Sequence, residues 1–139
     1  MDKRISTQGG CLCKAVRFKT TSASTLVSAC HCRMCRTWGG GPFMAVDCDP
    51  ETVFEGTENI SIFDSSDWAE RGFCSNCGSH LFYHLKRSES YQIPAGLFDD
   101  PDSFTLSLQV FTDKKPGFYN FANKTLCLSA AQVIEKYTP

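Results

Sequence analysis

Nine cysteines carry the chemistry of this 139-residue sequence, and seven of them stand in close groups. The densest group lies in the run Cys-His-Cys-Arg-Met-Cys-Arg, where Cys30, Cys32 and Cys35 lie within six consecutive positions. A closed structural zinc site has four protein ligands, whereas a catalytic zinc site has three and an open position for water or substrate. The central question is therefore whether a fourth ligand for this group lies elsewhere in the chain.

Two further pairs of cysteines are far apart in the sequence but suited to a single metal ion. The first pair has the spacing C-x-C, and alternate residues of a strand share a face, so both sulfurs can reach one ion. The second pair has the zinc-knuckle form C-x-x-C-G, in which glycine adopts the torsions of a tight turn. The alternative is that these cysteines are small buried apolar residues. Four thiolates complete a tetrahedral structural zinc site, whose predicted ligands are Cys11, Cys13, Cys74 and Cys77.

The group of three can be completed only by a ligand from outside it, and the candidates are Cys48, His31 and His84. In an extended segment His31 points to the face opposite its two cysteine neighbours. Single cysteines such as Cys48 and Cys127 more often pack than bind metal. The simplest assignment is four ligands at one site and three at the other, which leaves the open position of a catalytic zinc. An iron–sulfur cluster with a labile iron is the alternative, although no further ferredoxin-like spacing is present.

The residues directly after the group of three suit the wall of a binding site. Trp38 can supply an aromatic wall, and Gly39, Gly40 and Gly41 let backbone amides approach a peptide-like ligand. A plain turn and a core aromatic residue are the alternatives. We therefore take Trp38, Gly39 and Gly40 as candidate substrate-binding residues.

The elements that must position these residues are expected to be strands. Short alternating segments with β-branched or aromatic residues dominate the chain, and glycine and proline turn signals separate them. One helix is expected near the C-terminus, where Ser129 and Gln132 form a capping box. We predict an all-β fold with a short C-terminal helix, in a single domain over residues 1–139. The expected strands lie within 13–20, 25–30, 42–48, 52–56, 59–64, 80–85, 103–111 and 117–121.

Composition excludes several classes of partner. The net charge is −1, so no broad basic field invites nucleic acid or an anionic membrane. The N-terminal residues lack the apolar region of a signal peptide, and no stretch approaches the roughly 18 apolar residues of a membrane span. A cytoplasmic location is expected, where thiols stay reduced and cysteines favour metal ions over disulfides. The odd number of cysteines also prevents complete pairing within one chain.

Five blocks of the sequence together resemble one family. They are GGCLCKAVRF, CHCRMCRTWGGGPF, RGFCSNCGSHLF, AGLFDDPDSF and QVFTDKKPGFYNF, in this order from residue 9 to about residue 121. They resemble the glutathione-dependent formaldehyde-activating enzymes and the related centromere protein V. The resemblance implies a fold of the β-tent type with two zinc ions per chain, one structural and one exchangeable. Its motifs match Cys11, Cys13, Cys74 and Cys77 to the structural ion, and Cys30, Cys32 and Cys35 to the second ion.

The reaction of that family joins glutathione to formaldehyde, so the resemblance implies a carbon–sulfur lyase acting on adducts of a small thiol and a small aldehyde. A thiol that binds zinc loses its proton. Three thiolate ligands weaken the Lewis acidity of the ion, which favours thiol delivery over carbonyl activation. His80 and His84 share one face of an expected strand, and His84 is a candidate proton shuttle or a hydrogen-bonded, partly buried histidine. The alternative function is a non-catalytic zinc-binding protein that carries a thiol or contacts a macromolecular partner.

Overall fold

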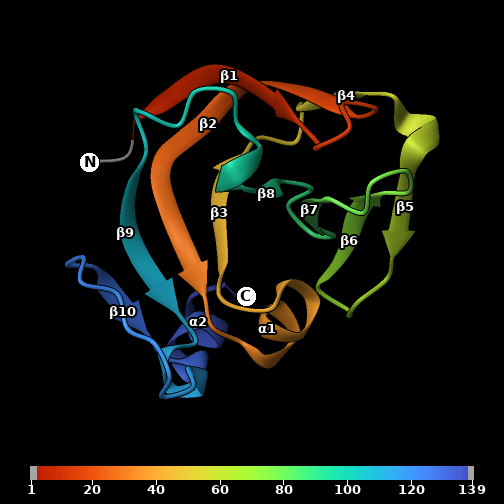
Figure 1. Cartoon of the computed structure of the whole chain (residues 1–139). Helices are drawn as coiled ribbons and strands as arrows, with labels where there is room; N and C mark the ends of the chain where they lie inside the picture. The colour runs from red at the N-terminus through yellow and green to blue at the C-terminus, as the bar shows by residue number, and fades with distance from the viewer. Residues whose placement is uncertain (1–2, 138–139) are drawn as a thin grey trace.

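The computed structural model describes residues 3–137, which form one ten-stranded sheet with two α-helices and three short 3-10 helices (Figure 1). None of the described helices is long and apolar enough to cross a membrane. The strands are β1 (Arg4–Gly10), β2 (Arg17–Cys30), β3 (Phe43–Cys48), β4 (Val53–Glu55), β5 (Ile60–Phe63), β6 (Ala69–Cys74), β7 (His80–Leu85), β8 (Tyr91–Pro94), β9 (Thr105–Val110) and β10 (Leu126–Leu128). The helices are α1 (Arg33–Gly39), α2 (Ala130–Tyr137), η1 (Thr57–Asn59), η2 (Ala95–Leu97) and η3 (Thr112–Lys114).

The long strand β2 organises the sheet because four other strands pair with it. Strands β1 and β4 pair with its first half, and β3 and β9 pair with its second half. The pairing with β9 is parallel, whereas the other three pairings are antiparallel. Figure 1 shows β2 curving from the level of β1 down toward α1. A single strand therefore connects the turn that carries Cys11 and Cys13 with the segment that carries the group of three cysteines.

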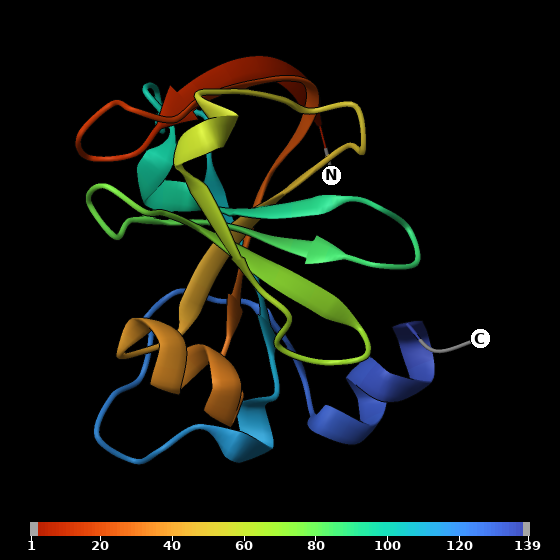
Figure 2. The same cartoon turned by 90° about the vertical axis from the view of Figure 1, so that its right-hand side faces the viewer.

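Beyond β3 the sheet continues through β8, β7, β6 and β5, and each of these pairings is antiparallel. Figure 2 shows these strands lying between β1 above and α1 below. The turn between β6 and β7 faces the turn between β1 and β2, because Cys13 and Cys74 lie close together. The start of β7 faces α1, since the rings of His80 and Trp38 are in contact.

The core lies inside the curved sheet and consists largely of aromatic and β-branched side chains. Along the start of β2, Phe18 is buried while its neighbours Arg17 and Lys19 are more exposed, which is the period of two expected for a half-buried strand. The Phe18 ring contacts the Phe98 ring edge-on, with centroids 5.0 Å apart. Full burial of such a side chain contributes about 1.5–3 kcal/mol.

The structure confirms the predicted all-β class and the short C-terminal helix. The capping box opens α2, because the Ser129 N–H donates to Gln132 Oε1 at 2.8 Å and the Gln132 N–H donates to Ser129 Oγ at 3.2 Å. The expected strand at 117–121 is wrong, since this segment has no regular structure. There the backbone carbonyl of Tyr119 accepts a hydrogen bond from Lys115 Nζ instead of joining a ladder.

Two local expectations about the cysteine motifs are also wrong. The C-x-C pair lies in a turn between β1 and β2, not in a strand, and the Lys14 N–H donates to the Cys11 carbonyl at 3.1 Å. The group of three is extended only up to Cys32, after which α1 begins. In both places a local hydrogen bond bends the chain, whereas the spacing of the cysteines alone indicates a straight, extended strand.

Candidate metal centres and the adjoining cavity

Two turns bring four cysteine sulfurs together. One pair lies between β1 and β2, and the other begins and ends the tight turn between β6 and β7. The four Sγ atoms lie within 4.8 Å of one another. Cys13 Sγ is 3.7 Å from Cys11 Sγ and 3.7 Å from Cys74 Sγ. Cys77 completes the group, so the fold unites two pairs that are far apart in the sequence.

These separations fit a tetrahedral zinc site. Zinc–sulfur bonds of about 2.3 Å at the tetrahedral angle place the sulfurs about 3.8 Å apart. The distances of 3.7 Å from Cys13 Sγ to Cys11 Sγ and to Cys74 Sγ match that edge length. Four thiolates leave no open position, so this donor set fits a structural ion and not a catalytic one.

Hydrogen-bond donors beside two of the four sulfurs favour the thiolate form. The Ser79 hydroxyl lies 3.2 Å from Cys77 Sγ, and this contact lowers the pKa of Cys77 to about 5. The Asn76 amide donates to Cys13 Sγ at 3.2 Å and lowers the pKa of Cys13 below its ordinary value. Gly78 adopts a φ of +80°, which the tight turn needs and which other residues rarely adopt. The turn thus supplies both the ligand atoms and donors that stabilise their charge.

The remaining group of three forms a second cluster at the junction of β2 and α1. Cys30 ends β2, Cys32 is the N-cap of α1, and Cys35 lies in its first turn. Their Sγ atoms also lie within 4.8 Å of one another. The Cys35 N–H donates to Cys32 Sγ at 3.4 Å, so the C-x-x-C spacing is the spacing from an N-cap to the third helical residue. The helix therefore turns two of the three sulfurs toward the same point.

The three neighbouring thiols of this cluster favour a bound cation. Hydrogen bonds from Cys30 and Cys35 lower the pKa of Cys32, whereas hydrogen bonding to Cys32 raises the pKa of Cys30. One thiolate thus forms readily, and a bound cation is needed to hold all three ionised. No other His, Cys, Asp or Glu of the described chain joins these three sulfurs. The donor set fits zinc with an open fourth position.

His31 stands between two of these cysteines but turns away from them. Its ring is fully buried, with Nε2 2.8 Å from Gln109 Oε1 and Nδ1 2.6 Å from the Tyr119 hydroxyl. Gln109 uses its amide nitrogen to donate to the Thr125 hydroxyl, so its oxygen is the acceptor for His31 Nε2–H. His31 Nδ1 therefore accepts from Tyr119. Both ring nitrogens are occupied, which agrees with the expectation that His31 is not a metal ligand.

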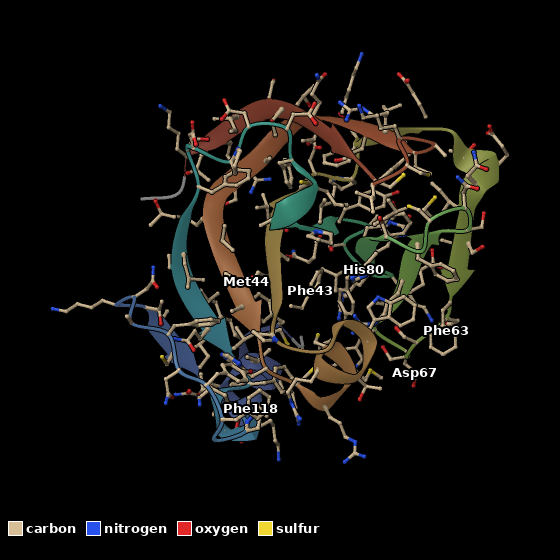
Figure 3. The ribbon with its side chains drawn as sticks, in the orientation of Figure 1. Phe43, Met44, Phe63, Asp67, His80 and Phe118 are labelled. Carbon is tan, nitrogen blue, oxygen red and sulfur yellow. The ribbon has the colours of Figure 1, made fainter. Side chains whose placement is uncertain are left out.

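A cavity of about 190 Å³ adjoins the second cluster at Cys35. Residues of α1, β3, β6 and β7 line it, among them Cys35, Trp38, Phe43, Arg71 and His80. The Phe43 and His80 rings have centroids 4.9 Å apart, and Figure 3 shows both side chains facing the space above α1. A concave, mostly apolar space with a few polar groups beside a candidate metal ion is typical of a small-molecule site.

His80 is the histidine that reaches this cavity. Its Nε2 lies 3.2 Å from the Phe82 carbonyl, which can only accept, so Nε2 carries the proton and Nδ1 is a free acceptor. Burial lowers the pKa of His80 to about 4, with the charge of Arg71 acting in the same direction. The ring is neutral at physiological pH. It cannot donate a proton through Nδ1 in that state.

Arg71 is a residue of the cavity that sequence reasoning missed. It lies on β6 and is only 2% exposed, with Nη2 3.6 Å from Cys35 Sγ. Its guanidinium also lies over the rings of Tyr83 and Trp38, at 4.8 Å and 5.8 Å from their centroids. The one signal in the sequence was its place two residues after buried Ala69, on the inward face of an alternating strand.

The other predicted residues divide between the cavity and the scaffold. Trp38, Gly39 and Gly41 line the cavity. Gly40 instead ends α1 with a φ of +89°, a left-handed conformation typical of helix ends. His84 is not among the residues that line the cavity: its Nδ1 lies 3.3 Å from a Glu70 carboxylate oxygen. The proton-shuttle role considered for His84 therefore has no geometric support.

The two leftover cysteines belong to neither cluster. Cys48 is fully buried, and burial raises its pKa to about 12, as expected for a packing residue. Cys127 is exposed and lies 3.5 Å from the Thr125 hydroxyl. The expectation that Cys127 packs in the interior is wrong, because the short strand β10 lies outside the core.

Comparison with known proteins places these clusters in a family. The family model for the glutathione-dependent formaldehyde-activating enzyme matches residues 6–114. An uncharacterized lyase of Schizosaccharomyces pombe is 39% identical over 129 residues, which cover 92% of this chain and 94% of that protein. The chain belongs to the glutathione-dependent formaldehyde-activating enzyme family. The family match contains all seven clustered cysteines, from Cys11 to Cys77.

Two more distant likenesses agree with this membership. A Halomonas elongata protein provisionally named a glutathione-dependent formaldehyde-activating enzyme is 36% identical over 84 residues, which cover 54% of each chain. The crystal structure of a Rhodobacter sphaeroides protein superposes with a TM-score of 0.55 at 22% identity, covering 66% of this chain and 87% of that one. The second likeness concerns the fold alone. The names of the two relatives link the family to a lyase activity and to glutathione and formaldehyde.

Proposed function

We propose that the protein is a zinc-dependent carbon–sulfur lyase that forms and cleaves adducts of a small thiol such as glutathione with a small aldehyde such as formaldehyde. The observation that carries the proposal is the contrast between the two cysteine clusters. One offers four sulfurs, whereas the other offers three beside a cavity. Only the second leaves a coordination position for a substrate.

In this proposal, Cys11, Cys13, Cys74 and Cys77 hold a structural zinc, and Cys30, Cys32 and Cys35 hold an exchangeable one. A bound zinc ion lowers the pKa of a thiol that coordinates it, so that the thiol is presented as thiolate. The chain's own residues orient the reaction. Trp38 and Phe43 form part of the cavity wall, and the His31 hydrogen bonds fix the backbone between two ligands.

The test compares reaction rates with and without an intact second cluster. We expect the zinc-loaded protein to accelerate exchange between free formaldehyde and S-hydroxymethylglutathione, measured by NMR exchange spectroscopy. Cys35→Ala should abolish the acceleration, because it removes a sulfur of the second cluster. Cys127→Ala is the matched control, since this cysteine belongs to neither cluster, and it should exchange at the wild-type rate.

Two results would refute the proposal. The first is an unchanged exchange rate in the presence of wild-type protein that holds two zinc ions, because such a protein does not catalyse the proposed reaction. If that protein still binds glutathione, the non-catalytic alternative of a thiol carrier takes its place. Equal acceleration by Cys35→Ala and wild type would remove the second cluster from the reaction.

A further inference from the structure

The buried guanidinium of Arg71 is a feature of the cavity that the proposed function leaves without a role. Arginine is almost never fully buried unless it is paired. Nη2 of Arg71 donates to Cys35 Sγ, but Nη1 has no hydrogen-bond partner among the described residues. It is the only buried side-chain nitrogen or oxygen of those residues in this condition. An unpaired buried donor on a charged group is costly, so this N–H suits an acceptor that arrives with a ligand.

The surroundings of Arg71 hold its position but satisfy only one edge of its guanidinium. Two aromatic rings, of Tyr83 and Trp38, lie against the guanidinium. None of the ion pairs between described residues involves Arg71. Three thiolates exceed the charge of one zinc dication, so Nη2 beside Cys35 faces a net negative cluster. The other edge of the guanidinium carries the buried, unpartnered Nη1, whose N–H suits a second negative or strongly accepting atom.

The volume of the cavity limits the size of the chemical group that can carry this acceptor atom. Pockets for drug-sized ligands enclose about 300–1,000 Å³, whereas this cavity encloses about 190 Å³. Trp38, Phe43 and Pro94 make much of its wall apolar. A group of a few heavy atoms fits, but a tripeptide does not.

The short distance between Arg71 and Cys35 indicates which atom of the substrate can accept a hydrogen bond from Arg71 Nη1. In the adduct of a thiol and an aldehyde, a single carbon separates the sulfur from the oxygen. In glutathione, several bonds separate the sulfur from either carboxylate. An acceptor for Nη1 must lie close to a sulfur bound beside Cys35, because Nη2 of the same guanidinium is 3.6 Å from Cys35 Sγ. The aldehyde-derived oxygen meets this condition, and the carboxylates do not.

We propose that Arg71 and this cavity bind the aldehyde-derived oxygen of the substrate, and that the cavity admits only a small aldehyde. The inference rests on the proposed function. The thiolate sulfur gives an electron pair to the carbonyl carbon, so the C–S bond forms and the C=O π pair moves to oxygen. Arg71 Nη1–H stabilises that alkoxide, which then takes a proton from water. In the cleavage direction the hydroxyl gives its proton to hydroxide, which becomes water, the C=O bond reforms and the thiolate leaves with the C–S pair.

The test uses formate, a one-carbon ligand with anionic oxygen, and needs neither glutathione nor turnover. Trp68→Phe leaves Trp38 as the single tryptophan, so fluorescence reports on the cavity wall. We expect formate to change this fluorescence saturably in the zinc-loaded protein. Arg71→Met should weaken formate binding about tenfold or more, the usual effect of removing a charge-assisted hydrogen bond. Arg33→Met, an exposed arginine on α1, is the matched control and should bind formate within about twofold of wild type.

Three results would overturn the inference. The first is the absence of a saturable response to formate in the wild type. The second is an Arg71→Met protein with intact fold and zinc content that binds formate as well as wild type does. The third applies even if no Arg71 variant folds: diphenylacetate, a carboxylate too large for a cavity of about 190 Å³, binds as well as formate. A protein that binds formate through Arg71 but does not accelerate the thiol exchange would refute the proposed function alone.

Discussion

His31 and Tyr119 share a hydrogen bond of 2.6 Å across 88 positions of the chain. The bond joins the residue between two clustered cysteines to the irregular segment that follows β9. With Gln109 and Thr125 it forms a chain of side-chain hydrogen bonds in which each buried His31 nitrogen has one partner. The backbone between Cys30 and Cys32 is thus fixed by residues far away in sequence.

Tyr119→Phe should lower the free energy of unfolding by about 1–3 kcal/mol, because it leaves the buried acceptor of His31 unpaired. Chemical denaturation of the zinc-loaded protein measures this change. Tyr137→Phe is the control, since that tyrosine is exposed on α2, and it should unfold like wild type. Equal stability of both variants would show that the His31–Tyr119 bond is not a stabilising contact.

Part of this arrangement could be predicted from the sequence and part could not. The spacing within each pair and within the group of three is local, so it marked seven cysteines as candidate ligands, and the four ligands that a closed zinc site needs predicted that the two distant pairs meet. The capping box at Ser129 was likewise readable from adjacent residues. The pairing of His31 with Tyr119 depends on contacts between distant segments, for which a single sequence holds no signal.

The helix α1 and the role of Arg71 were missed for different physical reasons. A helix of seven residues is too short to show a clear period of 3.6, and its N-cap is Cys32 rather than one of the usual capping residues. Arg71 was missed because a charged residue is expected at the surface. Here the neighbouring thiolates and aromatic rings make burial of its charge tolerable.

Cys77→Ala should prevent folding, because it removes one of four ligands from the proposed structural zinc. Structural zinc contributes about 10–16 kcal/mol in small zinc peptides, comparable with the total stability of a domain. Circular dichroism and solubility after expression with zinc provide the measurement. A soluble Cys77→Ala protein with wild-type melting would show that the four-cysteine cluster is not a structural metal site.

Cys35→Ala should fold but bind one zinc ion fewer than wild type. Its cluster joins only β2 and α1, whereas the four-cysteine cluster ties two distant turns together. Elemental analysis of purified protein gives the zinc content per chain. Cys48→Ala is a poor control because it opens a hole in the core, so Cys127→Ala serves instead. Unchanged zinc content in Cys35→Ala would contradict the division into four and three ligands.

His80 should make stability depend on pH below its ordinary pKa of about 6.5. Its pKa in the folded chain is lowered to about 4, so the folded state prefers the neutral ring. The contribution is fully present above about pH 6.5 and is lost as pH falls from there toward 4. In zinc-saturated protein the wild type should lose about 2 kcal/mol relative to His80→Gln between pH 7 and pH 5. Parallel stability curves for the two proteins would contradict a buried neutral His80.

Calorimetric titration of glutathione tests whether a metal ion held by Cys30, Cys32 and Cys35 receives the thiol. We predict that zinc-loaded wild type binds glutathione and that binding strengthens as pH rises toward the pKa of the thiol, because the bound form loses its proton. The analogue with serine in place of cysteine should bind far more weakly, and Cys32→Ala should lose glutathione binding. Equal affinity of wild type and Cys32→Ala for glutathione would contradict the account, since the thiol would then bind without the metal.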